Sequence, residues 1–200
     1  MIDKDLIQKC KSGDISAFER LIEAYSQKAF RTAYFIIKRK DLAEDLVQET
    51  FIKCYIDLPK LKNVEAFNAW FYKTLVHMSW RMSKRERLNF SLDETNVHKE
   101  FYKDYERLED YIILSAERKE RNLQIYNAIN NLKPLLKTTI ILYYFNDLSI
   151  KEISKIQGCL SGTVKSRLNT ARKQIKTALQ FKDDAQPTKN CNEKGVFKYE

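Results

Sequence analysis

The sequence predicts an all-α protein with two small helical domains joined by a linker, the C-terminal domain containing a helix-turn-helix. Two observations lead to this fold class. The 200 residues include only four glycines and three prolines, whereas an all-β protein needs many tight turns built from such residues. Apolar residues recur at three- and four-residue steps over long stretches, as they do on the buried face of a helix.

The first domain is expected to span residues 1–88. Residues 14–37 carry a continuous apolar stripe, and Ser16 with Glu19 has the spacing of a capping box near the start of this helix. A further helix, residues 66–87, is dense in aromatic side chains at one end and in cations at the other. The domain is therefore expected to have a substantial core and one basic edge.

Between these two lies a helix that is expected to begin at Asp41. Aspartate is a favourable N-cap, and Glu44 follows three residues later. Its sequence, DLAEDLVQETFIKCY, places polar residues along one edge, while three apolar side chains are expected to face inward: Leu42, Leu46 and Tyr55. The following LPKLKNVE contains Pro59 and Asn63 and is expected to be a loop.

The second half of the chain is divided by composition. Residues 89–117 are charged and mixed and are expected to be an interdomain linker. Helical periodicity returns in residues 118–181, the expected second domain, where Pro134 has the position of the first turn of a helix. Residues 182–200 are polar and aperiodic, so a disordered tail is expected.

The strongest local pattern is LSIKEISKIQGCLSGTVKSRLNTARKQI. Ser149 and Glu152 form a capping box that starts a short helix, and Gly158 suits the positive φ of a tight turn. Ser161 is a favourable cap for the next helix, residues 162–179. This arrangement is typical of a helix-turn-helix.

The last helix can be phased from its apolar residues. One side must pack on the domain, because it carries Val164, Leu168, Ala171 and Ile175. The opposite side carries groups suited to base edges in a major groove, namely Lys165, Ser166, Asn169, Thr170 and Lys173, flanked by Arg167 and Arg172. An ordinary amphipathic surface helix has a similar polar face. The pairing with a capped helix across a glycine turn favours DNA binding.

Composition bounds the remaining function classes. The formal net charge of +9 indicates a polyanionic partner, although it also serves solubility. The four cysteines lie far apart and form no metal-ligand or disulfide pattern, so no metal and no cofactor are expected. Since the sequence shows neither a signal segment nor a long apolar run, we expect a cytoplasmic protein without membrane insertion.

Three segments together resemble a known family. The C-terminal EISKIQGCLSGTVKSRLNTARKQI, the earlier DLAEDLVQETFIKCY and the aromatic FNAWFYKTL match, in order and spacing, segments of bacterial RNA polymerase sigma factors of the extracytoplasmic-function (ECF) type. The resemblance extends from about Asp5 to Leu179. It implies an alternative sigma factor that binds core polymerase and directs promoter-specific transcription initiation.

The resemblance implies two sets of contact residues. For the minus-thirty-five promoter element they are Ser161, Thr163, Lys165, Ser166, Arg167, Asn169, Thr170, Arg172 and Lys173. For docking on the coiled coil of the polymerase β′ subunit they are Asp41, Asp45, Leu46, Gln48, Glu49 and Phe51. The apolar run LLKTTIILYY is expected to build the second core and, by resemblance, to help receive the polymerase β flap.

A third set is implied for recognition and melting of the minus-ten element: Lys60, Asn63, Trp70, Tyr72, Lys73, His77, Trp80, Arg81, Lys84 and Arg85. An exposed aromatic ring can stack on an unpaired base. The other interpretation, that the aromatic residues belong to the core, is preferred for Phe67, Trp70 and Phe71. The family usually has Asn and Asp where this chain has His77 and Arg81, so these two positions leave the choice of base open.

Two other function classes differ from a sigma factor in the residues that they need. A helix-turn-helix transcriptional regulator would share the last two helices but would act without polymerase docking. A nuclease or recombinase needs clustered carboxylates or a nucleophile beside a base, and the sequence contains no such constellation. The sequence therefore predicts a non-enzymatic sigma factor with three partners: core RNA polymerase, promoter DNA and, by resemblance, a cognate anti-sigma factor.

Overall fold

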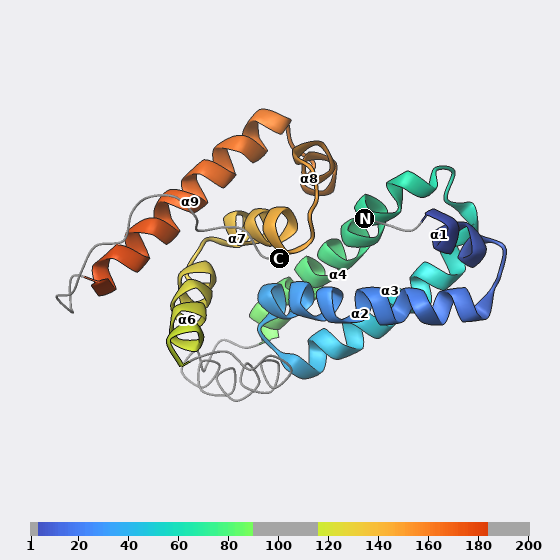
Figure 1. Cartoon of the computed structure of the whole chain (residues 1–200), viewed down its shortest axis with the longest axis horizontal. Helices are drawn as coiled ribbons and strands as arrows, with labels where there is room; N and C mark the ends of the chain where they lie inside the picture. Colours follow the sequence, from blue (N-terminus) through green and yellow to red (C-terminus); the bar gives the residue numbers. More distant parts are fainter. Residues whose placement is uncertain (1–3, 90–115, 184–200) are drawn as a thin grey trace.

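The computed structural model describes residues 4–89 and 116–183. Every regular element within these two ranges is helical, and Figure 1 shows the helices of the two ranges lying side by side. We call residues 4–89 the first unit and residues 116–183 the second unit. The all-α class is confirmed for the described residues.

The first unit consists of three long helices and a short N-terminal one. Its elements are α1 (Lys4–Lys11), α2 (Ile15–Ile37), α3 (Lys40–Asp57), the 3₁₀ turns η1 (Leu58–Lys60) and η2 (Val64–Ala66), and α4 (Phe67–Asn89). The Asp14 side chain caps α2 by accepting a hydrogen bond from the backbone N–H of Ala17 at 3.0 Å. The capping box predicted at Ser16 and Glu19 is therefore wrong, because the helix already begins at Ile15.

Helix α3 also begins earlier than its sequence predicts. Arg39 occupies the N-cap position without a side-chain cap, and Asp41 lies within the first turn, where its carboxylate binds the Arg39 guanidinium. An acidic group in the first turn still interacts favourably with the helix dipole. The prediction of Asp41 as the N-cap is thus wrong by two positions. The expected inward direction of Tyr55 is also wrong, because this side chain is half exposed.

The core of the first unit lies where α2, α3 and α4 pack together. The Phe71 ring is fully buried at its centre, with ring centroids 5.4 Å from those of both Tyr25 and Phe51. Tyr25 itself donates a hydrogen bond to the Asn68 side chain at 2.8 Å. Aromatic rings in edge and tilted contact thus pack against one another between the three helices.

The second unit combines several short helices with one long C-terminal helix. Its elements are α6 (Ala116–Asn130), α7 (Pro134–Ile140), the π-helical turn η3 (Ile141–Phe145), α8 (Ile150–Gln157) and α9 (Ser161–Asp183). Pro134 lies in the first turn of α7 as expected. The apolar run predicted to build this core does so, since its centre is buried together with the inner side of α8 and α9: Ile140, Ile141, Leu142, Ile153, Ile156 and Val164.

The two units are in direct contact. Helix α2 packs on α7 and η3, and α4 packs on α8. Most of the predicted linker and nearly all of the predicted tail lie outside the described residues, so the predicted boundaries of the domains stay predictions. No helix in the described part of the chain is long and apolar enough to cross a membrane.

The capping box of α8 generates a stability prediction. Replacing Ser149 with Ala is expected to lower the free energy of unfolding by about 1 kcal/mol, because the side-chain oxygen that accepts from a first-turn N–H is lost. Urea titration followed by circular dichroism measures the change. Ser154→Ala is the matched control, since that hydroxyl donates to the Lys151 carbonyl within the same helix. An unchanged midpoint in Ser149→Ala would contradict the prediction.

Candidate nucleic-acid and polymerase interfaces

The helix-turn-helix forms as its sequence predicts. Ser149 accepts from the Glu152 backbone N–H at 3.3 Å, and the Glu152 carboxylate accepts from the Ser149 N–H at 2.8 Å. Gly158 ends α8 with φ +61°, a left-handed conformation that favours glycine. The capping box and the glycine together fix both ends of α8 and so set the direction in which α9 leaves the turn.

Helix α9 presents the two faces that its periodicity predicts. The four apolar residues assigned to the inner side are all buried. Helix α9 begins at Ser161, which is itself partly buried. The outer side is exposed along its length and consists of Thr163, Lys165, Ser166, Asn169, Thr170 and Lys173. The Leu160 carbonyl accepts from the backbone N–H of Val164, so the predicted capping role of Ser161 is wrong.

Arg167 is held within the helix-turn-helix. Its guanidinium donates to the Gln157 side-chain oxygen and to the Cys159 sulfur, the latter at 3.5 Å. The Gln157 amide in turn donates to Thr139 Oγ1 at 2.9 Å. A chain of hydrogen bonds thus joins α7, α8 and α9. In this arrangement the Arg167 side chain fixes the turn between the last two helices, in addition to carrying a positive charge close to the outer face.

Arg172 is held in a similar way by two tyrosines. Its Nε donates to the Tyr144 hydroxyl at 2.8 Å, and its guanidinium carbon lies 5.8 and 5.6 Å from the ring centroids of Tyr143 and Tyr144. These distances are those of cation–π contacts. The side chain remains exposed, so its charge stays at the surface beside the polar face of α9.

Helix α3 carries the predicted acidic edge. Glu44, Asp45, Gln48 and Glu49 are all exposed. Asp41 is exposed as well, and the hydrogen bond from the Arg39 guanidinium holds the pKa of its carboxyl below the ordinary value. These residues lie on consecutive turns, so the structure places four acidic groups and one amide on a single accessible surface.

Two of the predicted polymerase contacts must be corrected. Leu46 and Phe51 were expected to add apolar contact for a partner, but both are buried in the core, and the Phe51 ring packs against that of Phe71. The reason is the position of the inward stripe of α3, which runs through Ala43, Leu46, Val47, Phe51 and Cys54. These side chains offer no surface to another protein.

The exposed apolar residues of α3 were not predicted. Ile52, Tyr55 and Ile56 are 62%, 51% and 59% exposed, although all three are large. The Phe18 ring of α2 packs in edge contact with the Tyr55 ring, and their centroids are 5.1 Å apart. We call Ile52, Tyr55 and Ile56 the α3 apolar patch. The signal that reveals them is their position off the core stripe, since apolar residues outside the buried periodicity face the solvent.

The aromatic segment of α4 is mainly core. Phe67 and Phe71 are fully buried, as the core interpretation expects, and Trp70 is partly buried with its ring 6.0 Å from that of Phe67. Tyr72 was assigned to the minus-ten element, and this assignment is corrected: its side chain is 1% exposed and packs against Phe71. Burial raises the pKa of the Tyr72 hydroxyl well above its ordinary value.

The cationic residues and the asparagine predicted to contact the minus-ten element are exposed, but they form two groups that differ in their local bonds. Lys73, Arg81, Lys84 and Arg85 are exposed along α4. Lys60 and Asn63 are exposed too but make local bonds: the Lys60 ammonium pairs with Asp57 at 2.9 Å, and the Asn63 side chain caps η2 through the Glu65 N–H at 2.8 Å. The two residues of the loop are therefore engaged in local bonds, and the basic edge of α4 is the more accessible group.

His77 and Trp80 touch the second unit. His77 Nε2 lies 2.7 Å from the Ile156 carbonyl oxygen at the end of α8, and Trp80 Nε1 donates to Thr138 Oγ1 on α7 at 3.4 Å. The two rings also stack on each other, with centroids 5.5 Å apart. Within the described residues, no group of three or more His, Cys, Asp or Glu side chains is placed to hold a metal ion.

Comparison with known proteins places both units in one family. A family model described as Sigma-70 region 2 matches residues 21–87, and one described as Sigma-70 region 4 matches residues 122–175. The RNA polymerase sigma-H factor of Pseudomonas aeruginosa is 31% identical over 183 residues, which cover 89% of this chain and 94% of that protein. The ECF RNA polymerase sigma-E factor of Haemophilus influenzae is 30% identical and covers 90% of this chain and 96% of its own length.

The chain belongs to the ECF family of RNA polymerase sigma factors. As a member of this family it is an alternative sigma factor that directs transcription. The ECF sigma factor SigW of Bacillus subtilis is a further relative, 26% identical over 90% of this chain and 98% of its own.

Solved structures show the same fold. The sigma factor RpoE of Bartonella quintana, determined in complex with the anti-sigma factor NepR, superposes with a TM-score of 0.61 at 21% identity, covering 83% of this chain and 98% of that chain. CnrH, determined with the cytosolic domain of CnrY, superposes with a TM-score of 0.63 at 18% identity, over 92% of this chain and 99% of that chain.

The partly buried Tyr25 of this sigma factor generates a pH prediction. Burial raises the pKa of Tyr25 from 10.0 to about 12. Because the folded pKa exceeds the unfolded one, the neutral phenol contributes fully below about pH 10 and the contribution is lost as the pH rises towards 12. The free energy of unfolding should therefore decline over this interval in urea titrations. Tyr25→Phe should decline less steeply, and an equal slope in both proteins would contradict the assignment.

Proposed function

We propose that this sigma factor joins core RNA polymerase to promoter DNA through separate outward surfaces of its two units, and that it has no catalytic activity of its own. The observation that carries the proposal is the pair of free surfaces described above. One is the polar face of α9 in the second unit, and the other is the acidic edge of α3 with its apolar patch in the first unit.

The outer face of α9 is suited to read the minus-thirty-five element. Lys165, Ser166 and Asn169 occupy the N-terminal half of a helix that follows a capped turn, the part of a recognition helix that enters the major groove. Thr163, Thr170 and Lys173 extend the same exposed face. Arg167 and Arg172 are tethered to the fold, so we assign them to positioning the helix and to attracting the phosphate backbone.

Helix α3 is proposed to dock on the β′ coiled coil. The exposed carboxylates and the amide of Asp41, Asp45, Gln48 and Glu49 supply a charged edge that steers a basic partner. The α3 apolar patch takes over the role that was assigned to Leu46 and Phe51, because it provides large accessible side chains next to this edge. A charged rim beside an apolar centre is the usual composition of a protein interface.

The basic edge of α4 is proposed to hold the minus-ten region. Lys73, Arg81, Lys84 and Arg85 supply phosphate contacts, and His77 with Trp80 supplies a pair of stacked rings for an unpaired base. Lys60 and Asn63 remain candidates for an extruded base beside η1 and η2. Trp70, which is partly buried, is assigned a supporting role at the base of this surface.

Further partners are proposed from the family. An anti-sigma factor is supported by the structural neighbours, of which RpoE was determined in complex with one. The β flap of polymerase is proposed to contact the second unit near α7. Since RNA polymerase acts in the bacterial cytoplasm, we propose that this sigma factor works there too. The alternative of a regulator without polymerase docking has no support in the comparisons, which match sigma factors over both units.

The assignment of α9 is tested by Lys165→Ala. Transcription from a matched promoter by polymerase and this variant should fall roughly tenfold, because one favourable contact in the major groove contributes about 1–3 kcal/mol. Lys176→Ala is the control: this exposed lysine lies on the same helix about 16 Å further along the axis. Equal activity of the two variants would contradict the placement of α9 in the groove.

The assignment of α3 is tested by Ile52→Asp and Ile56→Asp. Each variant should bind purified core polymerase at least roughly tenfold more weakly in a fluorescence titration, because a desolvated apolar centre carries most of the affinity of an interface. Ala24→Asp is the control, since it adds the same charge at an exposed site on α2. Unchanged affinity in both α3 variants would place the docking surface elsewhere.

A further inference from the structure

Leu160 is the most exposed large apolar side chain that the structure describes. It lies in the turn between α8 and α9 and is 80% exposed. It lines an open hollow together with Ser154, Lys155, Gly158 and Cys159. A single exposed apolar residue is common on protein surfaces. Exposure alone therefore indicates no function, and the position of this leucine in the helix-turn-helix has to be considered.

Leu160 occupies the N-cap position of α9. Its carbonyl accepts from the backbone N–H groups of Thr163 at 2.9 Å and of Val164 at 3.2 Å, while α9 itself begins at Ser161. Serine, threonine, aspartate and asparagine stabilise a helix from this position, because their side-chain oxygens accept from a first-turn N–H. Leucine has no such oxygen. The chain thus has at this position a side chain that neither caps the helix nor packs in the core.

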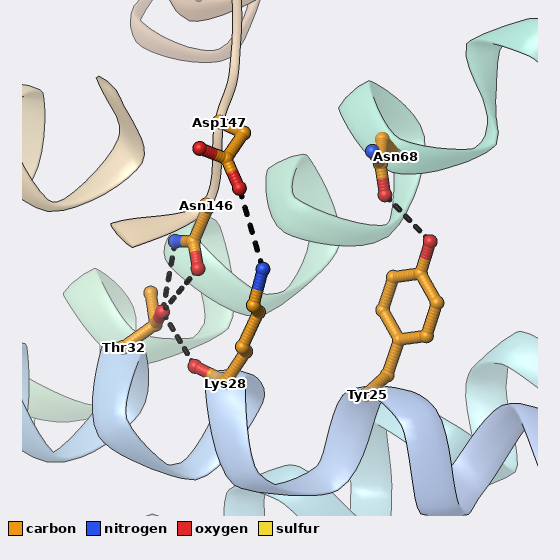
Figure 2. Close-up of polar contacts among 6 residues, drawn as sticks. All are labelled: Tyr25, Lys28, Thr32, Asn68, Asn146 and Asp147. Carbon is orange, nitrogen blue, oxygen red and sulfur yellow. Dashed lines mark hydrogen bonds and ion pairs between the residues drawn. The ribbon is translucent and has the colours of Figure 1, made fainter. Parts of the chain in front are cut away.

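The contact between the two units leaves Leu160 uncovered. The second unit packs on α2 and α4 through α7, η3 and α8. Figure 2 shows the polar part of this boundary, where the Asn146 amide donates to Thr32 Oγ1 at 2.9 Å. Beside it the Lys28 ammonium lies 3.3 Å from the Asp147 carboxylate. With these contacts formed Leu160 is still exposed, so a partner that covers it must come from outside the described part of the chain.

The position of Leu160 places it at the end of α9 that is proposed to enter the major groove. The N-terminal residues of a recognition helix contact base edges, and helical side chains are tilted towards the N-terminus. Thr163, three residues after Leu160, belongs to the exposed outer face of α9. Because residues three apart lie on the same side of a helix, Leu160 extends this outer face by one turn towards the DNA.

An apolar side chain at this end of the helix distinguishes one base by its chemistry. In the major groove guanine, cytosine and adenine present hydrogen-bond donors and acceptors, whereas thymine presents an acceptor and a 5-methyl group. A leucine beside a donor or acceptor removes water from it without providing a partner, which is unfavourable. Beside the thymine methyl group it instead buries apolar surface. The chemistry of Leu160 therefore favours thymine.

We propose that Leu160 is a specificity-determining residue that recognises a thymine in the minus-thirty-five element through van der Waals contact with its 5-methyl group. The inference rests on the proposed role of α9, and it adds one base and the group that is recognised on that base. Lys165, Ser166 and Asn169 supply polar contacts from the outer face, and Leu160 supplies an apolar one. Thr163 also has a methyl group at this end of the helix, so the test has to separate its contribution from that of Leu160.

The test removes the methyl group from the DNA and the side chain from the protein. Core polymerase with the full-length chain first selects a promoter from random-sequence templates. Each thymine in the selected minus-thirty-five element, on either strand, is then replaced singly by deoxyuridine, which differs from thymidine only in lacking the 5-methyl group. The half-saturating chain concentration for transcription is measured on every template for the unaltered sequence, Leu160→Ala, Leu160→Ser and Thr163→Ser.

The expected result is a preference for thymine that depends on Leu160. With the unaltered chain, deoxyuridine at one position should raise the half-saturating concentration roughly fourfold, as expected for the loss of one buried methyl group. Leu160→Ala and Leu160→Ser should respond equally to thymine and deoxyuridine at that position, whereas Thr163→Ser should keep the fourfold preference. Because Leu160→Ser restores a side-chain cap, its urea midpoint should rise, so a loss of fold does not explain its loss of preference.

Four results would overturn the proposal: a minus-thirty-five element without thymine, no position at which deoxyuridine weakens the unaltered chain, a preference for thymine that Leu160→Ala retains, or weaker binding of core polymerase by Leu160→Ala in the absence of DNA. The last result would show that Leu160 contacts polymerase. If Lys165→Ala transcribes as well as the unaltered chain, the placement of α9 in the groove fails instead, so the two failures are distinguishable.

Discussion

Helix α2 packs against both units at once, and the rest of the structure depends on this constraint. Its apolar stripe, in which Leu21 is fully buried, packs on α3 and α4 and holds the first unit together. Near its C-terminal end the same helix also offers Thr32 and Phe35 to the second unit. A helix that is buried on more than one side can shift only slightly without disturbing the side chains packed on it. The position of the second unit is therefore coupled to the core of the first.

The outward surfaces exist because the core uses only part of each helix. In α9 four apolar residues at three- and four-residue steps are sufficient to anchor the helix, which leaves the opposite side free for polar and basic groups. In α3 the buried stripe includes Val47, Phe51 and Cys54, and Ile52 and Ile56 are exposed because they lie off this stripe. Large exposed apolar groups beside an acidic edge are costly in a free protein and are consistent with the proposed docking surface.

Local patterns in the sequence predicted the local structure well. The capping box at Ser149, the glycine turn at Gly158 and both faces of α9 follow from residues within one or two helical turns of each other, where spacing alone determines the outcome. The same reasoning failed at Asp14, because aspartate and serine both suit an N-cap and only the surrounding chain decides between them. It also failed at Phe51, where a resemblance to a docking helix outweighed the evidence of the core stripe.

Contacts between distant parts of the chain could not be predicted in this way. Thr32 and Asn146 are separated by 114 positions, and neither residue stands in a pattern that indicates burial. A polar residue between apolar neighbours is equally compatible with solvent and with a specific partner. For the same reason His77 and Trp80 were identified as candidates from their chemistry, while their contact with α7 and α8 required the folded structure.

The most direct test of the central claim, that this chain links polymerase to promoters through two separate surfaces, is a map of RNA 5′ ends. Purified core polymerase would transcribe a library of random-sequence templates with and without the full-length chain. The account predicts new start sites that appear only with the chain and share two short sequence elements at a constant separation. Start sites that are equal in number and distribution in both reactions would contradict it.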